Sequence, residues 1–216
     1  MPGMTLEDII IRVPVIIIAL TLHEIAHGYV AYKLGDITAK NDGRLSLNPL
    51  RHIDPIGLIM LIVLRFGWAK PVMINPNNLK DPKKDMAVIS LAGPMTNIVL
   101  SMLCFIPIYA MNISPFEAPP GSSYMVQFLQ MGFFINLSLA VFNILPIPPL
   151  DGSKVLGSLL PDRLYYKAVL APSRIGMGIM LLLMVTGVLS RIIVPMILSV
   201  IYLYYSAAGL IAGLFK

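Results

Sequence analysis

Long apolar runs, each close to the length that crosses a lipid bilayer, constrain this chain more than any other feature. They cover about residues 9–33, 86–111, 124–148, 174–190 and 192–213. A helix needs about 20 apolar residues to cross the hydrocarbon core. We therefore predict an all-α polytopic membrane protein with about five transmembrane helices. A shorter apolar stretch, 56–68, is interrupted by Arg65 and is not expected to cross.

The composition also indicates that lipid surrounds the chain. Hydrophobic residues make up 57% and charged residues 12%, and the mean hydropathy is +0.81, whereas soluble domains carry about 25% charged residues. The net charge of +5 comes from Lys and Arg in short loops, where basic residues set membrane orientation. We therefore expect no nucleic-acid partner. The single cysteine, Cys104, excludes an intrachain disulfide and a cysteine metal cluster.

The basic residues predict how the chain is oriented. Lys and Arg occur in segments 33–54, 65–85 and 151–174, but not in 112–123. By the positive-inside rule the first three segments are cytoplasmic. The stretch 56–68 must then enter and leave the membrane on the same side, as a re-entrant segment. Such backbone is tolerated only where protein or a water-filled cavity satisfies it, so a polar cavity open to the cytoplasm is expected.

A small β element is predicted on the cytoplasmic side. Residues 37–40 and 44–47 flank Asn41-Asp42-Gly43, a turn signal suited to a hairpin. Residues 70–75 contain proline and β-branched side chains and are predicted to be extended. An irregular loop is an equally good interpretation of these segments.

The motif His23-Glu24-Ile25-Ala26-His27 lies within the first apolar run. Residues i and i+4 share one face of a helix, so both imidazoles can reach one ion, with Glu24 beside them. H-E-x-x-H is typical of zinc metalloproteases, in which two histidines bind the metal and the glutamate is the general base. Ionisable groups are costly in membrane helices and mark functional sites there. We therefore predict a zinc site with Glu24 as the base.

A catalytic zinc site usually has a third protein ligand, and the sequence offers two candidates. His52 follows the first cytoplasmic loop, and Asp151 follows a proline-rich stretch that cannot sustain a regular helix. Asp151 ends the third run on the cytoplasmic side, at a depth similar to that of His23 and His27. We predict Asp151 as the third ligand; an interfacial or helix-capping aspartate is the alternative.

Together these motifs resemble the site-2 proteases, a family that performs regulated intramembrane proteolysis. The resemblance rests on His23 to His27, on Gly93-Pro94-Met95-Thr96-Asn97 and on residues 143–152, in this order. It covers about 15–155, including the stretches 48–57 and 67–72. It looks closest to short members without PDZ or CBS domains. We therefore predict one membrane-embedded domain over 1–216, with a core at about 9–155 and a C-terminal helix pair at about 174–213.

The resemblance implies an intramembrane zinc endopeptidase with one Zn²⁺ per chain. His23, His27 and Asp151 would bind the metal, and Glu24 would be the base. Asn143 would stabilise the oxyanion or hold substrate, and Asn97 would lie near the site, because side-chain amides can donate to a developing oxyanion. Hydrogen bonding between helices is the alternative role for both amides. The role of His52 stays open.

The implied substrates are transmembrane proteins or peptides in the lipid bilayer, reached from the cytoplasmic side of the cell membrane. An extended substrate could pair with the edge at 70–75. A metal transporter or a noncatalytic metal-binding scaffold is the alternative function. A transporter needs ionisable groups along its path, and the last three apolar runs have almost none. The sequence indicates neither which substrate is cut, nor the oligomeric state, nor the role of the last two helices.

Overall fold

The computed structural model describes residues 6–57, 69–117, 119, 121–162, 164–165 and 173–214, and within these ranges it contains helices but no named β-strand. The helices are α1 (Leu6–Lys33), α2 (Thr38–Asn41), η1 (Pro49–Arg51), η2 (Pro76–Asn78), α4 (Pro82–Ala110), α5 (Tyr124–Asn143), α6 (Asp151–Ser158), α8 (Ser173–Val185) and α9 (Val188–Leu214). Four of those described, α1, α4, α5 and α9, are long and apolar enough to cross a membrane. The apolar part of α8 is shorter, Gly176–Val185. The all-helical prediction is confirmed for the described residues, and four of their helices, rather than about five, reach spanning length.

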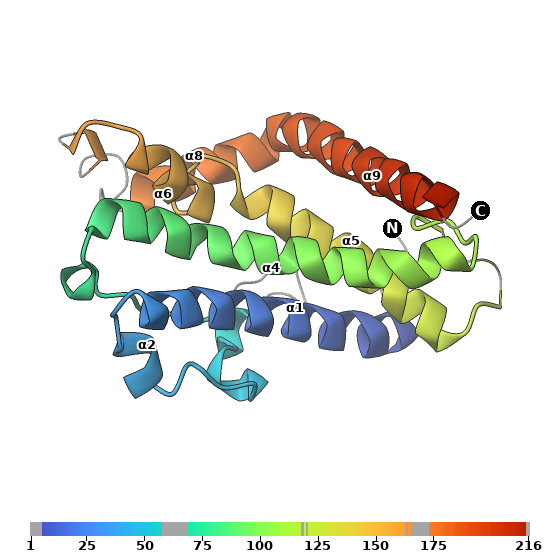
Figure 1. Ribbon diagram of the computed structural model, residues 1–216, viewed down its shortest axis with the longest axis horizontal. Coiled ribbons are helices and arrows are strands. Elements are labelled where there is room, and N and C mark those ends of the chain that lie inside the picture. Colours follow the sequence, from blue (N-terminus) through green and yellow to red (C-terminus); the bar gives the residue numbers. More distant parts are fainter. Residues whose placement is uncertain are drawn as a thin grey trace.

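The spanning helices pack around α4 (Figure 1). α4 contacts α1 and α5, and α9 packs on α5 and α4. Aromatic side chains from three of these helices, Phe105, Phe133 and Tyr204, meet in one buried cluster. Gly132 lets α5 approach α4 closely, because a Cβ at this position would lie 2.8 Å from the Sγ of Cys104. Membrane helices associate through such close packing at small residues.

The hairpin predicted over 37–47 is wrong. Thr38–Asn41 forms a single helical turn, α2, whose first main-chain N–H donates to the Asp36 carboxylate. The Asn41-Asp42-Gly43 signal ends this turn, with Gly43 at a φ of +65°. Glycine in this left-handed conformation is as typical of a helix end as of a hairpin, so the pattern alone did not separate the two.

Residues 70–75 belong to no named helix or strand. The nearest β pairing is an isolated antiparallel bridge between Ile53 and Ala69, and the Lys70 N–H donates to the His52 carbonyl at 2.9 Å. The small β element is therefore reduced to this bridge among the described residues. The predicted re-entrant stretch 56–68 lies, from residue 58 onward, outside them.

The connector that follows α2 runs back along α1. Leu47 and Pro49 line an apolar cavity of about 230 Å³ with Ile17 and Leu22 of α1. Ile17 precedes Lys33, the last residue of α1, by 16 residues, which is about 24 Å along a helix axis. The connector therefore reaches the middle of the first spanning helix.

Asp36 ties the end of α1 to the segment that leads into α4. Its buried carboxylate accepts hydrogen bonds from the Thr38 N–H and hydroxyl, from the Asn75 N–H at 2.7 Å and from the Asn78 side-chain amide at 2.7 Å. Burial alone would raise the pKa of Asp36, but these donors outweigh burial and hold its pKa below the usual range. The ionised form is therefore the one that stabilises this junction.

We expect Asp36→Ala to lower the free energy of unfolding by about 3 kcal/mol, because several buried donors lose a charged acceptor. Thermal unfolding in detergent measures this, with the exposed Asp42 changed to alanine as the matched control. Since the folded-state pKa is lowered, the stabilisation is present above the unfolded-state value of about 3.9 and is lost as pH falls through the folded-state pKa. Equal loss in the two variants would contradict this role.

Candidate metal centre

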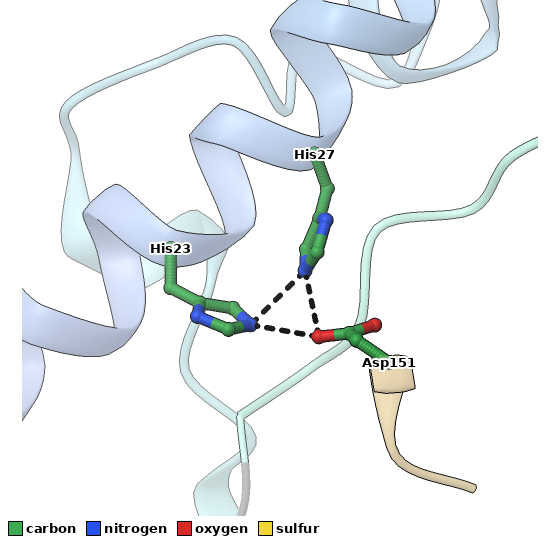
Figure 2. Close-up of side chains that lie close together, drawn as sticks. All are labelled: His23, His27 and Asp151. Atoms are coloured by element: carbon green, nitrogen blue, oxygen red, sulfur yellow. Dashed lines mark hydrogen bonds and ion pairs between the residues drawn. The ribbon is translucent and has the colours of Figure 1, made fainter. Parts of the chain in front are cut away.

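Three side chains from segments far apart in the sequence converge at one point (Figure 2). His23 and His27 come from α1, and Asp151 is the first residue of α6. The two Nε2 atoms lie 3.0 Å apart, and Asp151 Oδ2 lies 3.3 Å from His23 Nε2 and 3.1 Å from His27 Nε2. All three side chains are buried. The structure thus brings together the three residues predicted as metal ligands.

The chemistry of these donors fits a cation between them. His23 Nδ1 lies 2.6 Å from Asn97 Oδ1, and His27 Nδ1 lies 2.7 Å from the Ile89 carbonyl oxygen. Oxygen accepts in both contacts, so in the neutral imidazoles each Nδ1 carries the proton and each Nε2 keeps its lone pair. Two such lone pairs and a carboxylate oxygen repel one another at this spacing. Tetrahedral zinc with bonds of about 2.0–2.1 Å would set them about 3.3 Å apart.

Gly93 of α4 leaves room beside these ligand atoms. A Cβ on Gly93 would lie 2.4 Å from His27 Nε2 and 2.6 Å from His23 Nε2, closer than real atoms approach. The α4 backbone therefore passes directly against the ligand side of both rings. The sequence pattern contained Gly93 but gave it no role.

The proline-rich loop that carries Asp151 is held by the two C-terminal helices. Leu145 and Leu150 of this loop pack with Met180 of α8 and Leu189 of α9 in one buried cluster. A Cβ on Gly176 of α8 would lie 2.3 Å from the Pro148 carbonyl oxygen, so α8 touches the loop backbone itself. The last two helices, whose role the sequence left open, support the loop that presents the third predicted ligand.

The charge of Asp151 suits metal binding. Burial alone would raise the pKa of this carboxyl group, but charged and polar neighbours, the ammonium of Lys154 among them, outweigh burial and hold the pKa below its usual range. Lys154 Nζ lies 3.4 Å from Asp151 Oδ1. Asp151 is therefore a carboxylate at neutral pH.

The half-buried Glu24 is oriented by the segment 70–75. Glu24 Oε2 accepts a hydrogen bond from the Val72 N–H at 2.8 Å. The buried guanidinium of Arg44 holds this segment in turn, because it donates to the carbonyl oxygens of Lys70 and Pro71. The predicted base and the predicted edge for substrate thus lie in direct contact.

The other predicted residues lie in different places. Asn97 contacts the cluster through His23. The Asn143 side chain donates to the Leu139 carbonyl of its own helix at 2.9 Å, and its predicted part in oxyanion binding stays a prediction. His52 is buried, with its Nε2 at 2.8 Å from the Ser46 carbonyl oxygen, and the structure does not bring it into the cluster.

Comparisons with known proteins find relatives that are named as zinc metalloproteases. The model of peptidase family M50 matches residues 120–186. The Bacillus subtilis (strain 168) protein named "Putative zinc metalloprotease YwhC" is 40% identical over 183 residues, which cover 84% of this chain and 83% of that protein. "Putative zinc metalloprotease Rip2" of Mycolicibacterium smegmatis is 30% identical over 182 residues, 81% of this chain and 66% of that protein. No solved structure matches the chain.

Proposed function

We propose, from the premise that the chain belongs to peptidase family M50, the site-2 proteases, that this membrane metalloprotease is a zinc-dependent endopeptidase that cleaves transmembrane segments of other membrane proteins. The observation that carries the proposal is the meeting of His23, His27 and Asp151 within a bundle of membrane-spanning helices. Ionisable side chains are costly at such a depth unless they serve a function.

The residues around the cluster divide the work of hydrolysis. A bound Zn²⁺ would act as a Lewis acid that polarises the scissile carbonyl and makes water more acidic. Glu24 takes the proton from the attacking water and passes it to the leaving amine nitrogen. The Val72 N–H holds the Glu24 carboxylate in place for both transfers. His23, His27 and Asp151 would hold the metal through their facing donor atoms.

The proposed substrates are single-span membrane proteins or remnants of an earlier cut, as in regulated intramembrane proteolysis. A substrate helix hides its carbonyls in i→i+4 hydrogen bonds, so it must unwind before it is cut. Segment 70–75, which touches Glu24, would supply an edge on which the unwound peptide can align. Met73 of this segment is exposed, whereas Val72 is buried.

We also propose that the site opens to the cytoplasmic side of the cell membrane. His27 lies six residues before Lys33, the last residue of α1. The same end of the bundle carries Lys83 at the start of α4 and Lys154 in α6, as the positive-inside rule expects for a cytoplasmic face. Water and substrate would then reach the metal from this side.

The decisive experiment pairs zinc content with cleavage. Purified wild-type protein should bind about one zinc per chain and cut members of a panel of tagged single-span substrates. A chelator should stop cleavage and added zinc restore it, and His27→Ala should lose both properties. Wild-type protein that binds no zinc after reconstitution contradicts the proposal. Zinc binding without any cleavage supports a scaffold or transporter, and metal flux into vesicles then separates these two.

Val72→Pro tests the contact between segment 70–75 and Glu24. Proline removes the N–H that orients the carboxylate, so we expect turnover to fall about tenfold, a barrier change of about 1.4 kcal/mol, while bound zinc is unchanged. Val72→Ala keeps the N–H and is the matched control. Equal turnover in the proline variant and the alanine variant would show that this hydrogen bond has no part in hydrolysis.

A further inference from the structure

Two buried asparagines extend the hydrogen bonding of His23 across three helices. Asn97 Oδ1 of α4 accepts from His23 Nδ1 at 2.6 Å. Asn97 Nδ2 donates to Asn136 Oδ1 of α5 at 2.8 Å and, at 3.4 Å, to the Ala19 carbonyl oxygen. Asn136 Nδ2 donates to the Gly132 carbonyl oxygen at 2.8 Å. Asn97 is 0% exposed and Asn136 4% exposed, so water does not compete for these bonds.

The direction of these hydrogen bonds is set at Gly132, the end of the series furthest from His23. The Gly132 carbonyl can only accept, so it draws Nδ2 of Asn136 and turns Oδ1 of Asn136 toward Asn97. That oxygen also can only accept, so Asn97 must present its Nδ2 there and its Oδ1 to His23. His23 Nδ1 is then the donor, and Nε2 keeps the lone pair that faces the cluster. A main-chain carbonyl thus selects the tautomer of a predicted metal ligand through two amides.

We propose that Asn136 is a positioning residue that fixes the metal-binding tautomer of His23 through Asn97. The competing tautomer carries its proton on Nε2, within reach of Asp151 Oδ2 at 3.3 Å and of His27 Nε2 at 3.0 Å. Such internal hydrogen bonds would close the metal-free site against an ion. The hydrogen bonds that run from Gly132 through Asn136 and Asn97 to His23 oppose the Nε2 tautomer. They do so without a buried charge, which would be costly among membrane helices.

The zinc measurement in this test rests on the proposed function, whereas the measurement of the His23 tautomer does not. Groups that hydrogen-bond to metal-binding histidines typically contribute about 10- to 100-fold in metal affinity, and since Asn136 acts through Asn97, we expect Asn136→Leu to lose about 10-fold in a chelator competition. Asn136→Asp in its neutral form has nearly the same shape, donates its O–H to the Gly132 carbonyl and keeps an acceptor for Asn97 Nδ2, so it should stay close to wild type. Gln130→Leu is the matched control, because Gln130 is a buried amide of the same helix that bonds to the Ser114 carbonyl instead.

Nitrogen spectra of histidine-labelled, metal-free protein report the tautomer directly, and the chain has only three histidines to assign. We expect His23 to carry its proton on Nδ1 in wild type and in Asn136→Asp, and to populate the Nε2 form in Asn136→Leu. Asn136→Ala replaces the leucine variant if that variant does not fold. An unchanged His23 tautomer, or a zinc affinity no lower than that of Gln130→Leu, overturns the proposal. Wild-type protein that binds no zinc would contradict the proposed function. The spectra would still show whether Asn136 sets the tautomer of His23.

Discussion

Replacing Glu24 with glutamine should lower peptide-bond hydrolysis by about 10²- to 10⁴-fold, the usual contribution of a general acid–base group, and leave bound zinc unchanged. Glutamine has nearly the same shape, and its side-chain oxygen can still accept from the Val72 N–H, which reaches Glu24 at 2.8 Å. It cannot take a proton from water at neutral pH. The loss therefore isolates proton transfer from metal binding and from local packing.

The measurement compares initial rates of cleavage and zinc per chain in wild type, Glu24→Gln and Glu117→Gln. Glu117 is exposed and lies in the loop between α4 and α5, so the same chemical change there should alter neither quantity. Full activity in Glu24→Gln would remove Glu24 from the role of base. Loss of zinc together with activity would instead make Glu24 a structural part of the site.

Gly93→Ala should abolish stoichiometric zinc binding, and hydrolysis with it. The added methyl group would lie 2.4 Å from His27 Nε2 and 2.6 Å from His23 Nε2, so α4 or the rings must move. Overpacking of this kind costs about 1–3 kcal/mol of stability, and a ring displaced from the centre no longer offers its lone pair. Activity should not return at high zinc concentration, because the obstruction is steric.

Zinc content and thermal unfolding test Gly93→Ala against Gly178→Ala. A Cβ on Gly178 of α8 meets no atom within 4 Å, so that change should leave zinc binding intact. If Gly93→Ala bound zinc with wild-type affinity, the close passage of α4 would not be a requirement of the site.

The parts of the site that the sequence predicted depend on local spacing. His23 and His27 are one helical turn apart, so their shared face follows from the motif alone. Asp151 was predicted from depth and from the prolines before it. Asn136 was missed, because a sequence does not tell which face of α5 meets Asn97. Its polar side chain within an apolar run was the available signal.

The break between the two predicted C-terminal helices shows a similar limit. The predicted runs 174–190 and 192–213 placed the break beside Ser190 and Arg191, but α8 ends at Val185 and α9 begins at Val188. Gly187 makes the turn with a φ of +71°, and the two polar residues lie in the first turn of α9. Polarity indicated that a break exists, whereas backbone conformation decided where it falls.

The distance along the chain between the predicted ligands has a consequence for biogenesis. His23 and Asp151 are 128 residues apart, and α4, α5 and the supporting pair α8 and α9 must all be in place before their donor atoms meet. Membrane helices insert first and associate afterwards. A nascent chain still leaving the ribosome therefore lacks the metal centre. The predicted ligands can therefore meet only late in synthesis, once the helices that support the Asp151 loop have been inserted.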